Sequence, residues 1–418
     1  MRTTADSASQ VHLPRRRRIG VFLPVSGRGE LLDTAINHAL MLKMGSEAAG
    51  EGVDVVVSYA AGDSGDVRNL RRLAESRITV RETTWQPISK EELGVAGRYM
   101  GVEYQLDAPA YAYPSDGASN FLDCDFWYVI ADRNGAPLAP LRRYAIYVND
   151  CFQRYLPELL AGDGDAGFIA TTRRSAVALC TTPFTRDDLV QYVGLPARKV
   201  ALVAPSLRPV SLPGDAAGRR TMHPRAYFLW QTDVLPHGNH EIALRGIQRY
   251  VENLDGNLDV VIAGPDTDQF DPRTEPGEVS AHVRRVRQQL AKRQLSTERI
   301  RWVGNVDHDE YASFLSGAQW LFDPSLIDAA PLRAAEAAGF GVPTLSSDYP
   351  PMRFYDATFG LGATFFDASD ENAIATALKD AESRLTELKR RLPVPADLAK
   401  FDLGGAAPSL WNVVRQHV

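Results

Sequence analysis

The sequence predicts an α/β protein made of two Rossmann-like, doubly wound units that face a cleft. Three observations lead to this prediction. Short β-rich runs alternate with helix-compatible stretches along most of the 418 residues, a rhythm typical of parallel sheets covered by helices. The rhythm stops at a segment rich in Pro, Gly and Arg and then starts again. The length also suits two domains, at roughly 150 residues per domain.

The composition is that of a folded protein without a strong charge bias. Hydrophobic residues make up 44% of the chain and charged residues 23%, which excludes a disordered or collagen-like chain. The net charge of −6 argues against broad binding to nucleic acid, which needs a basic face. Cys124, Cys151 and Cys180 form no close pair and predict a reduced, cytoplasmic protein. No apolar run reaches the length of about 18 residues that a membrane-spanning helix needs.

Residues 1–18 are expected to form a basic N-terminal tail, which ends in the run Arg15–Arg18. This run has two interpretations. It is either a solvated tail or a site of peripheral contact with the inner, anionic face of the cytoplasmic membrane, where each charge would contribute about 1 kcal/mol.

The first Rossmann-like domain is predicted over residues 19–205 and is expected to bind the acceptor. It opens with a strand at 19–24, a glycine-containing turn at 26–30, a helix at 31–49 and a strand at 53–58. The pattern breaks between Pro87 and Asn120, where we expect a long irregular insert. Further strands are expected at 78–80, 126–131, 144–148, 167–170, 176–180 and 200–204, with a helix at 185–193.

Residues 206–224 lack periodicity and are predicted to form a linker. The second domain is expected over 225–395, and residues 396–418 are expected to form a tail whose helix, near 409–417, packs back across both domains. Strands of the second domain are predicted at 227–230, 258–263, 300–303, 320–322, 342–345 and 364–366, and helices at 240–251, 279–293, 308–315, 332–338 and 370–390. Ligands of such sheets bind beyond the carboxyl ends of the strands.

Two acids eight residues apart, Asp328 and Glu336, flank the N-terminus of a helix that is predicted to begin near Pro331, with Glu336 one to two turns inside it. A helix N-terminus offers unpaired N–H groups and a partial positive charge, which suit a phosphate. A carboxylate nearby could accept hydrogen bonds from sugar hydroxyls. The alternative is that Asp328 caps the helix and Glu336 is a surface acid.

These residues and their surroundings resemble the GT-B glycosyltransferases, in particular the retaining group called family four. The resemblance covers about Ile19 to Lys389 and rests on the acid pair followed by Gly341 and Pro343. It implies that Glu336 binds the ribose hydroxyls of a nucleotide sugar and that Asp328, which replaces the usual Glu, faces the donor sugar.

The resemblance extends to other donor-side segments. Tyr227 to His240 resembles a stretch that contains Pro-His-Lys-Asn-His in relatives, and it places Gly238 and Asn239 at the donor. Trp302 to Val306 resembles the loop that faces the nucleotide base, which assigns Gly304 and Asn305 to donor binding. Ser325, in the loop before Asp328, completes this set.

Gly238 stands where relatives carry the lysine that neutralises the donor diphosphate. Charge stabilisation of a leaving group is usually a large catalytic contribution. Either Arg333, Arg353 or Arg28 supplies the charge, with Arg333 favoured because it lies near the helix N-terminus, or the domain has lost donor turnover. A lysine restored at position 238 is then expected to hold or raise activity.

The first domain contributes three further candidates. Gly27 and Gly29 would let the backbone approach a phosphate or the acceptor, although a plain tight turn explains them equally well. Asp150 closes a strand, and the resemblance places a cleft-facing His or Asp there; a structural cap is the alternative. No metal site is expected: Asp123 and Asp125 precede a strand rather than follow one, and Asp266 and Asp268 lie in an acidic loop.

The resemblance therefore implies an enzyme that transfers a sugar from a UDP-, GDP- or dTDP-sugar to a glycan or lipid-linked glycan in bacterial surface-polysaccharide synthesis. It implies retention of the anomeric configuration and no requirement for a metal or cofactor. Two alternatives remain open. One is a catalytically lapsed GT-B domain that acts as a binding or scaffold partner of another glycosyltransferase subunit. The other is a GT-B sugar-nucleotide epimerase or a phosphorylase.

Overall fold

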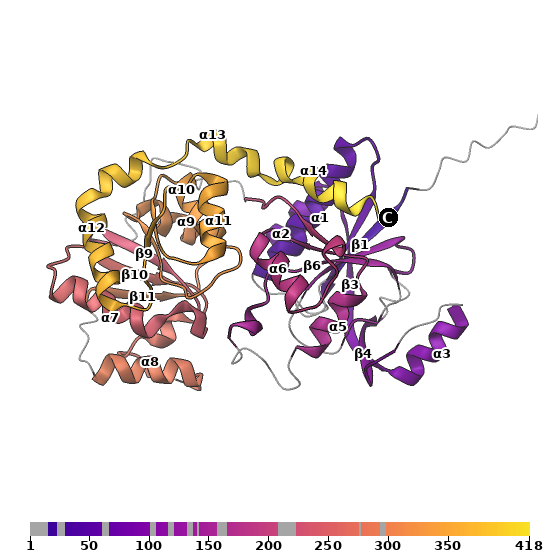
Figure 1. The fold of residues 1–418 in the computed structure, drawn as a ribbon, viewed down its shortest axis with the longest axis horizontal. Helices are drawn as coiled ribbons and strands as arrows, with labels where there is room; N and C mark the ends of the chain where they lie inside the picture. The colour runs from indigo at the N-terminus through magenta and orange to yellow at the C-terminus, as the bar shows by residue number, and fades with distance from the viewer. Residues whose placement is uncertain are drawn as a thin grey trace, which may run out of the picture. The chain divides into compact units, whose positions relative to one another are not determined.

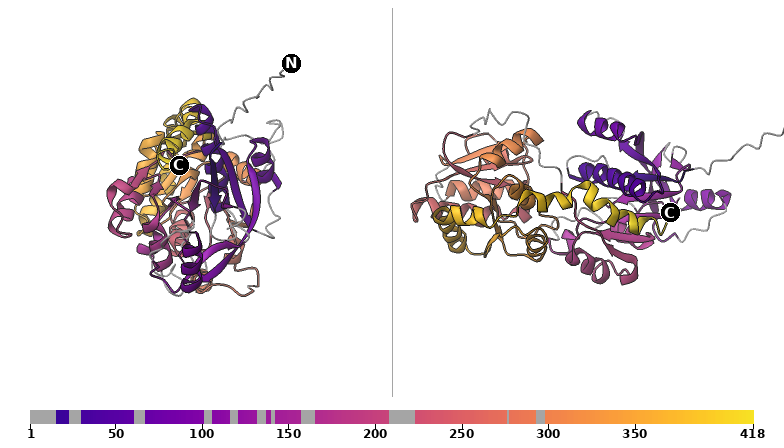
Figure 2. Two further views of the ribbon diagram at one scale, coloured as in Figure 1. Left: turned by 90° about the vertical axis from the view of Figure 1, so that its right-hand side faces the viewer. Right: turned by 90° about the horizontal axis from the view of Figure 1, so that it is seen from above.

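The computed structural model describes residues 16–22, 30–60, 67–100, 106–115, 121–131, 137–139, 142–156, 165–207, 223–275, 277–292 and 298–418. These residues form an α/β structure with two sheets (Figures 1 and 2). Contacts divide the chain into two compact units. The first comprises the described residues up to Tyr147 together with 166–178 and 407–418, and the second comprises those of 148–165 and 179–406. No helix among the described residues combines the length and apolar character that crossing a membrane requires.

The first sheet has the strand order β4-β3-β2-β1-β5-β6-β7-β8. Strands β1, β2, β3, β5 and β6 pair in parallel, and β4 runs antiparallel to β3. Every residue of β5 and β6 is buried, as expected where helices cover both faces of a sheet. The bounds are β1 (Arg18–Phe22), β2 (Asp54–Ala60), β3 (Thr79–Ser89), β4 (Ala110–Ser115), β5 (Phe126–Ile130), β6 (Tyr144–Tyr147), β7 (Val177–Cys180) and β8 (Val200–Leu202).

The helices of this half of the chain follow the expected alternation with strands. Residues 407–414 of the last helix, α14, lie against α1, and Arg415 forms an ion pair with Glu51 at 3.1 Å (Figure 1). The bounds are α1 (Glu30–Ala48), α2 (Val67–Glu75), α3 (Lys90–Met100), η1 (Phe152–Arg154), α5 (Ala166–Arg174), α6 (Pro183–Gln191), η3 (Ala197–Lys199) and α14 (Leu403–Val414).

Two predictions for the first half are wrong. The run 167–170, predicted as a strand, lies in α5, whose buried residues Phe168, Thr171 and Thr172 follow the i, i+3, i+4 spacing of a helix. The segment 87–120 is not irregular where it is described. It contains the end of β3, then α3 and β4, and Leu93 and Tyr111 form a small core there with Ala139.

Two of the N-terminal arginines contact other parts of the protein. Arg17 donates from Nη1 to the carbonyl oxygen of Val418 at 2.5 Å. Arg18 forms ion pairs with Asp54 and Asp123. Asp123 also accepts hydrogen bonds from Arg81 at 2.8 and 3.0 Å, and these contacts lower the pKa of Asp123 to about 2. Arg15 lies outside the described residues, and membrane contact stays a prediction.

The second sheet has the order β11-β10-β9-β12-β13-β14, and every recorded pairing within it is parallel. Its strands are β9 (Tyr227–Gln231), β10 (Asp259–Ala263), β11 (Ile300–Gly304), β12 (Leu321–Asp323), β13 (Thr344–Ser347) and β14 (Thr364–Phe366). Its helices are η4 (Pro236–Gly238), α7 (His240–Glu252), η5 (Thr267–Phe270), α8 (Ala281–Lys292), α9 (His308–Gly317), α10 (Leu332–Gly339), α11 (Pro350–Phe359), α12 (Glu371–Arg390), α13 (Pro395–Leu398) and η6 (Ala399–Phe401).

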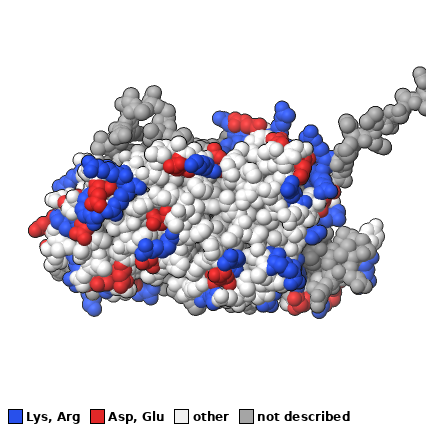
Figure 3. Space-filling view, turned by 45° about the horizontal axis from the view of Figure 1, so that its top comes forward, with Lys and Arg blue, Asp and Glu red and all other residues white. Residues whose placement is uncertain are grey.

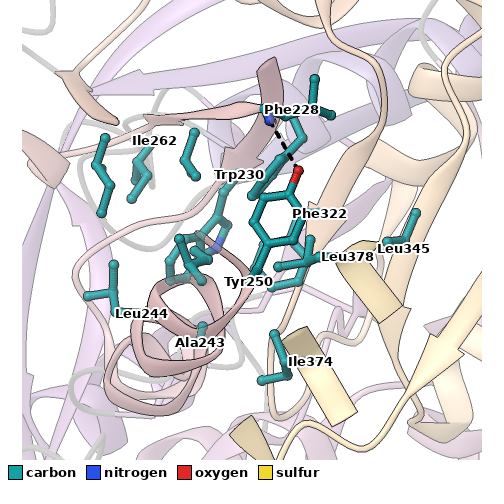
Figure 4. Packing of buried hydrophobic residues seen from close by; sticks show 14 of the residues in the cluster. Phe228, Trp230, Ala243, Leu244, Tyr250, Ile262, Phe322, Leu345, Ile374 and Leu378 are labelled. Atoms are coloured by element: carbon teal, nitrogen blue, oxygen red, sulfur yellow. Dashed lines mark hydrogen bonds between the residues drawn. The ribbon is translucent and has the colours of Figure 1, made fainter. Parts of the chain in front are cut away.

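Alternate residues of β9 supply two separate cores, which shows that both faces of this sheet are covered. Phe228 and Trp230 belong to a core with α7, α8 and α12, whereas Tyr227 and Leu229 belong to one with α9 and α10. Figure 4 shows the first core, where the hydroxyl of Tyr250 accepts a hydrogen bond from the amide of Leu258 at 3.1 Å. The doubly wound α/β prediction is confirmed.

The charged surface agrees with the mild net charge. Positive and negative side chains are interspersed on the face of the molecule in Figure 3. Several exposed charged side chains of the protein pair with one another, for example Arg384 with Glu387 at 2.8 Å. Exposed pairs of this kind contribute about 0 to 1 kcal/mol each, so they add little to the stability of the fold.

Candidate functional site

The second sheet has a topological switch point at β9. The strand that follows β9 in the chain, β10, pairs on one side of it, and β12 pairs on the other. Loops on the two sides therefore diverge at the carboxyl ends of β9 and β12, which is where open α/β sheets bind their ligands. A small pocket lies at this point and is lined by Gln231, Leu321, Phe322, Asp323, Asp328, Pro331, Arg333 and Ala334.

Asp328 is placed in this pocket by a tight turn between β12 and α10. Its Oδ1 accepts a hydrogen bond from the amide of Ala330 at 2.9 Å. Only 16% of its side chain is exposed, and burial raises the pKa of Asp328 above its ordinary value. The nearby Arg333 opposes that shift, and the negative charge of Asp323 adds to it. A carboxyl group in this position can accept a hydrogen bond from a sugar hydroxyl when it is ionised and can donate one to it when it is protonated.

Arg333 supplies positive charge in the same pocket. It is the second residue of α10, and its Nη1 donates to the carbonyl oxygen of Gln231 at 3.2 Å. Its Nη2 lies 3.9 Å from Oδ2 of Asp328. The guanidinium thus connects the end of β9 with the start of α10. Arg353, another candidate for the missing charge, instead forms two hydrogen bonds with Asp348 at 2.8 and 2.7 Å on the surface.

A polar network that the sequence analysis did not single out supports this loop. Asp323, the last residue of β12, accepts hydrogen bonds from the hydroxyl of Ser325 at 2.5 Å and from that of Tyr349 at 2.8 Å. Tyr349 is buried, and burial raises its pKa well above the ordinary value, so it stays a neutral donor. Ser325 therefore shapes the loop before Asp328, and its role in donor binding stays a prediction.

Glu336 lies in the second turn of α10 and is half-buried. It is three residues after Arg333, a spacing that places both side chains on neighbouring positions of the helix surface. Helix α10 thus carries a cation, Arg333, and an acid, Glu336, on neighbouring surface positions. Asp328 precedes the first turn of this helix. Contact between Glu336 and a donor stays a prediction.

Asn239 and Gly238 follow β9 and have different surroundings. Asn239 has a left-handed conformation, and its buried amide donates to the carbonyl oxygens of Pro324 at 3.1 Å and Ala368 at 2.9 Å. It thereby joins the loops that follow three strands. A Cβ atom on Gly238 would lie 2.4 Å from the imidazole of His240 and 2.7 Å from Oγ1 of Thr232.

His240 cannot easily move away from position 238. Its ring stacks on Trp230 with a centroid separation of 5.4 Å, and its two nitrogens contact Thr232 at 3.1 Å and His282 at 3.0 Å. A lysine at position 238 would therefore displace a buried, hydrogen-bonded imidazole. This packing argues against the expectation that a lysine restored at position 238 holds or raises activity, because the sequence alone does not show the position of His240.

Gly304 is the last residue of β11, which pairs with β10, and Asn305 follows it. Gly304 has a φ of +77°, and its carbonyl oxygen accepts a hydrogen bond from Gly264 at 2.9 Å. Asn305 is exposed. The helix that follows begins with a capping box of Asp307 and Glu310. Donor contact by Gly304 and Asn305 stays a prediction.

Asp150 belongs to the segment after β6, and contacts group this segment with the second unit. Its Oδ1 accepts a hydrogen bond from the amide of Phe152 at 3.0 Å. Phe152 packs with Ile327 and Ala329, which flank Asp328 in the chain, and its ring centroid lies 5.6 Å from that of His237. The segment of Asp150 therefore contacts the loop of Asp328. The candidates Gly27, Arg28 and Gly29 lie outside the described residues.

Comparison with known proteins identifies the fold. Residues 224–392 match the model of the glycosyl transferases group 1 family. Sucrose-phosphate synthase from Thermosynechococcus elongatus has a similar structure, with a TM-score of 0.66, 14% identity and coverage of 96% of this chain and 99% of that one. No curated protein matches the sequence.

Two further solved structures are similar to this protein over nearly their whole length. HepE from Anabaena, solved with UDP and glucose, has a TM-score of 0.65 and 10% identity, with coverage of 96% of this chain and 100% of that one. WaaG, a glycosyltransferase involved in lipopolysaccharide biosynthesis, has a TM-score of 0.61 and 12% identity, with coverage of 95% and 99%. The chain thus has the GT-B fold of these structures, and its second sheet lies within the stretch that matches the glycosyl transferases group 1 family.

Proposed function

We propose that this glycosyltransferase moves a sugar from a nucleotide-sugar donor to a glycan or lipid-linked glycan of a bacterial surface polysaccharide. The observation that carries the proposal is the pairing of Arg333 with the buried Asp328 at the switch point of the group 1 domain. A cation beside a hydrogen-bonding carboxyl group suits a ligand with both phosphates and sugar hydroxyls. The presence of UDP and glucose in the HepE structure supports a nucleotide-sugar donor.

Each group then has a distinct role in the donor complex. Arg333 stabilises the negative charge that develops on the leaving diphosphate, which is where preorganised charge contributes most to catalysis. Asp328 faces the donor sugar, and Glu336 accepts hydrogen bonds from the ribose hydroxyls. Asn239 and Ser325 hold the loops around the donor, and Gly304 and Asn305 lie toward the nucleotide base.

The transfer proceeds with retention and without a metal in this proposal. The acceptor hydroxyl attacks on the same face as the leaving diphosphate, an oxygen of which takes the hydroxyl proton. The new glycosidic bond forms as the bond between the anomeric carbon and the phosphate oxygen breaks. Asp150 lies on the acceptor side in this proposal, and the contact of its segment with the loop of Asp328 through Phe152 supports that assignment.

A transfer assay with UDP-, GDP- and dTDP-sugars tests the proposal. With a suitable lipid-linked or glycan acceptor, one donor should be consumed, and NMR of the product should show the anomeric configuration of the donor. Transfer should continue at an unchanged rate in excess EDTA. An inverted product would refute retention, and loss of transfer with EDTA would refute metal independence. Donor conversion without an acceptor would indicate an epimerase instead.

A further inference from the structure

We propose that His237 replaces the lysine expected at the next position and that it binds the phosphates of the donor in its protonated form. Donor binding would then be coupled to the uptake of a proton. This inference rests on the proposed function, because it names a group that neutralises the donor diphosphate together with Arg333. It also explains how the site functions although position 238 carries a glycine.

Position 238 is tightly packed in this protein, so a side chain there would require its neighbours to shift. A Cβ atom there would overlap with His240, which is held by Thr232, His282 and Trp230. The backbone is fixed as well, since the amide of Gly238 donates to Leu235 at 3.1 Å. Position 238 therefore contributes no side-chain charge, and any cation that acts together with Arg333 comes from another position.

His237 is the adjacent residue in the same short helix, η4, and it faces the loop of the proposed donor site. Its carbonyl oxygen accepts a hydrogen bond from the amide of Leu326 at 2.8 Å. Its ring contacts that of Phe152, which packs on both neighbours of Asp328. These contacts hold the imidazole at the carboxyl end of β9, close to Asp328.

The hydrogen bonding of His237 is incomplete. Its Nδ1 is buried and has no partner among the described residues. Its Nε2 lies 3.9 Å from Oδ2 of Asp233, beyond the range of a hydrogen bond. A buried polar atom without a partner is unfavourable and is often a sign of a ligand or a functional role. An imidazolium presents two N–H donors, and a phosphate oxygen can accept a hydrogen bond from either.

The titratable groups around His237 come from the loops after β9 and β12 and from α7 and α8. Asp233 faces it from the loop after β9, and Asp328 faces it from the loop after β12. From α7, His240 is buried, and burial lowers its pKa well below the ordinary value, so that it stays neutral. From α8, burial and Arg285 lower the pKa of His282 as well. Phe152, which packs against the ring, carries no charge.

Imidazole is the side chain whose charge ordinarily changes between pH 5 and 8, and a nearby anion favours its charged form. A bound diphosphate should therefore draw a proton to His237 from the buffer. For a nucleotide whose own charge is constant over this range, affinity for the phosphates then falls as the pH rises, by at most about tenfold per pH unit for one proton.

Calorimetric titrations of the full-length protein test the proposal. The probes are UDP, GDP and dTDP and the nucleosides uridine, guanosine and thymidine, each at pH 6, 7 and 8 in two buffers of different ionisation enthalpy. Binding of the diphosphate should take up a fraction of one proton at pH 7, whereas the nucleoside should take up none. His237→Arg should keep the affinity and lose the proton uptake, and His237→Gln should bind the diphosphate at least tenfold more weakly.

His417→Gln, which changes a histidine on the first unit, is the matched control and should behave as the wild type. Diphosphate binding without proton uptake, or with uptake that persists in His237→Arg, would overturn the inference and leave the proposed function intact. Failure of the wild type to bind any of these nucleotides would overturn both. If His237→Gln does not fold, the comparison of proton uptake between the wild type and His237→Arg alone tests the inference: loss of uptake supports it, and persistence contradicts it.

Discussion

Replacing Gly264 with Ala is expected to lower the free energy of unfolding by more than about 3 kcal/mol. Gly264 directly follows β10 and has a φ of +135°, a conformation that L-residues rarely adopt. A Cβ atom would lie 1.8 Å from the carbonyl oxygen of Thr232, which belongs to the backbone and cannot rotate away. The ends of β9 and β10 would have to separate, next to the proposed donor site. Equilibrium unfolding in urea measures the change.

Gly341→Ala is the matched control for this prediction. Gly341 also has a positive φ, of +75°, but a Cβ atom there would meet nothing within 4 Å. We therefore expect only the cost of the left-handed conformation, about 1 to 2 kcal/mol. An equal loss of stability in the two variants would contradict the close approach of the strand ends at Gly264.

Replacing Arg333 with Ala is expected to lower kcat by about 100- to 1000-fold, the range found when one preorganised stabilising group is removed. The reason is that Arg333 is the cation beside Asp328 at the switch point, where the leaving diphosphate would lie. Initial rates of sugar transfer at saturating donor measure the effect. A thermal melt shows whether the variant is folded.

Two further variants separate charge from position. Arg333→Lys keeps the charge but loses the planar guanidinium, so we expect it to recover only part of the rate. Arg353→Ala removes a surface arginine whose side chain is 54% exposed and paired with Asp348, and it should transfer sugar at the wild-type rate. If the Arg353 variant loses activity and the Arg333 variant keeps it, the assignment of the leaving-group charge to Arg333 is wrong.

The second sheet could be predicted from the sequence almost residue by residue. The run 227–230 corresponds to β9 at 227–231, and the run 364–366 coincides with β14. These strands are short, apolar and bounded by turns, which is the strongest pattern that a parallel sheet produces. Helix α11 was missed, although Pro350 at its start and the left-handed Gly360 at its end mark both termini.

Other elements could not be recognised because their sequence pattern fits more than one type of secondary structure. The run 167–170 is too short for its period to distinguish a strand from a turn of helix. Helix α14 begins at Leu403, six residues before the predicted helix, because Gly404, Gly405 and Pro408 conceal its start. The side chain of Asp402 accepts a hydrogen bond from Gly405 at 2.7 Å and stabilises this first turn.

The candidate site was only partly predictable for a related reason. Asp328 and Arg333 flank or begin a helix, and a local motif reveals such residues. Tyr349 and Gln231 join the site through contacts between distant strands, and nothing local marks them. Whether position 238 can hold a lysine depends on the packing of His240, which a sequence pattern cannot show.

Direct titration of the wild type and of Glu336→Ala with the nucleotide sugar that the protein transfers tests the central claim, that α10 holds the donor. A hydrogen bond to a charged group contributes about 1.5 to 3 kcal/mol, so the variant should bind at least about tenfold more weakly. Glu278→Ala, which removes an exposed acid, should bind as the wild type does. Equal affinity of the Glu336 variant and the wild type would contradict the account.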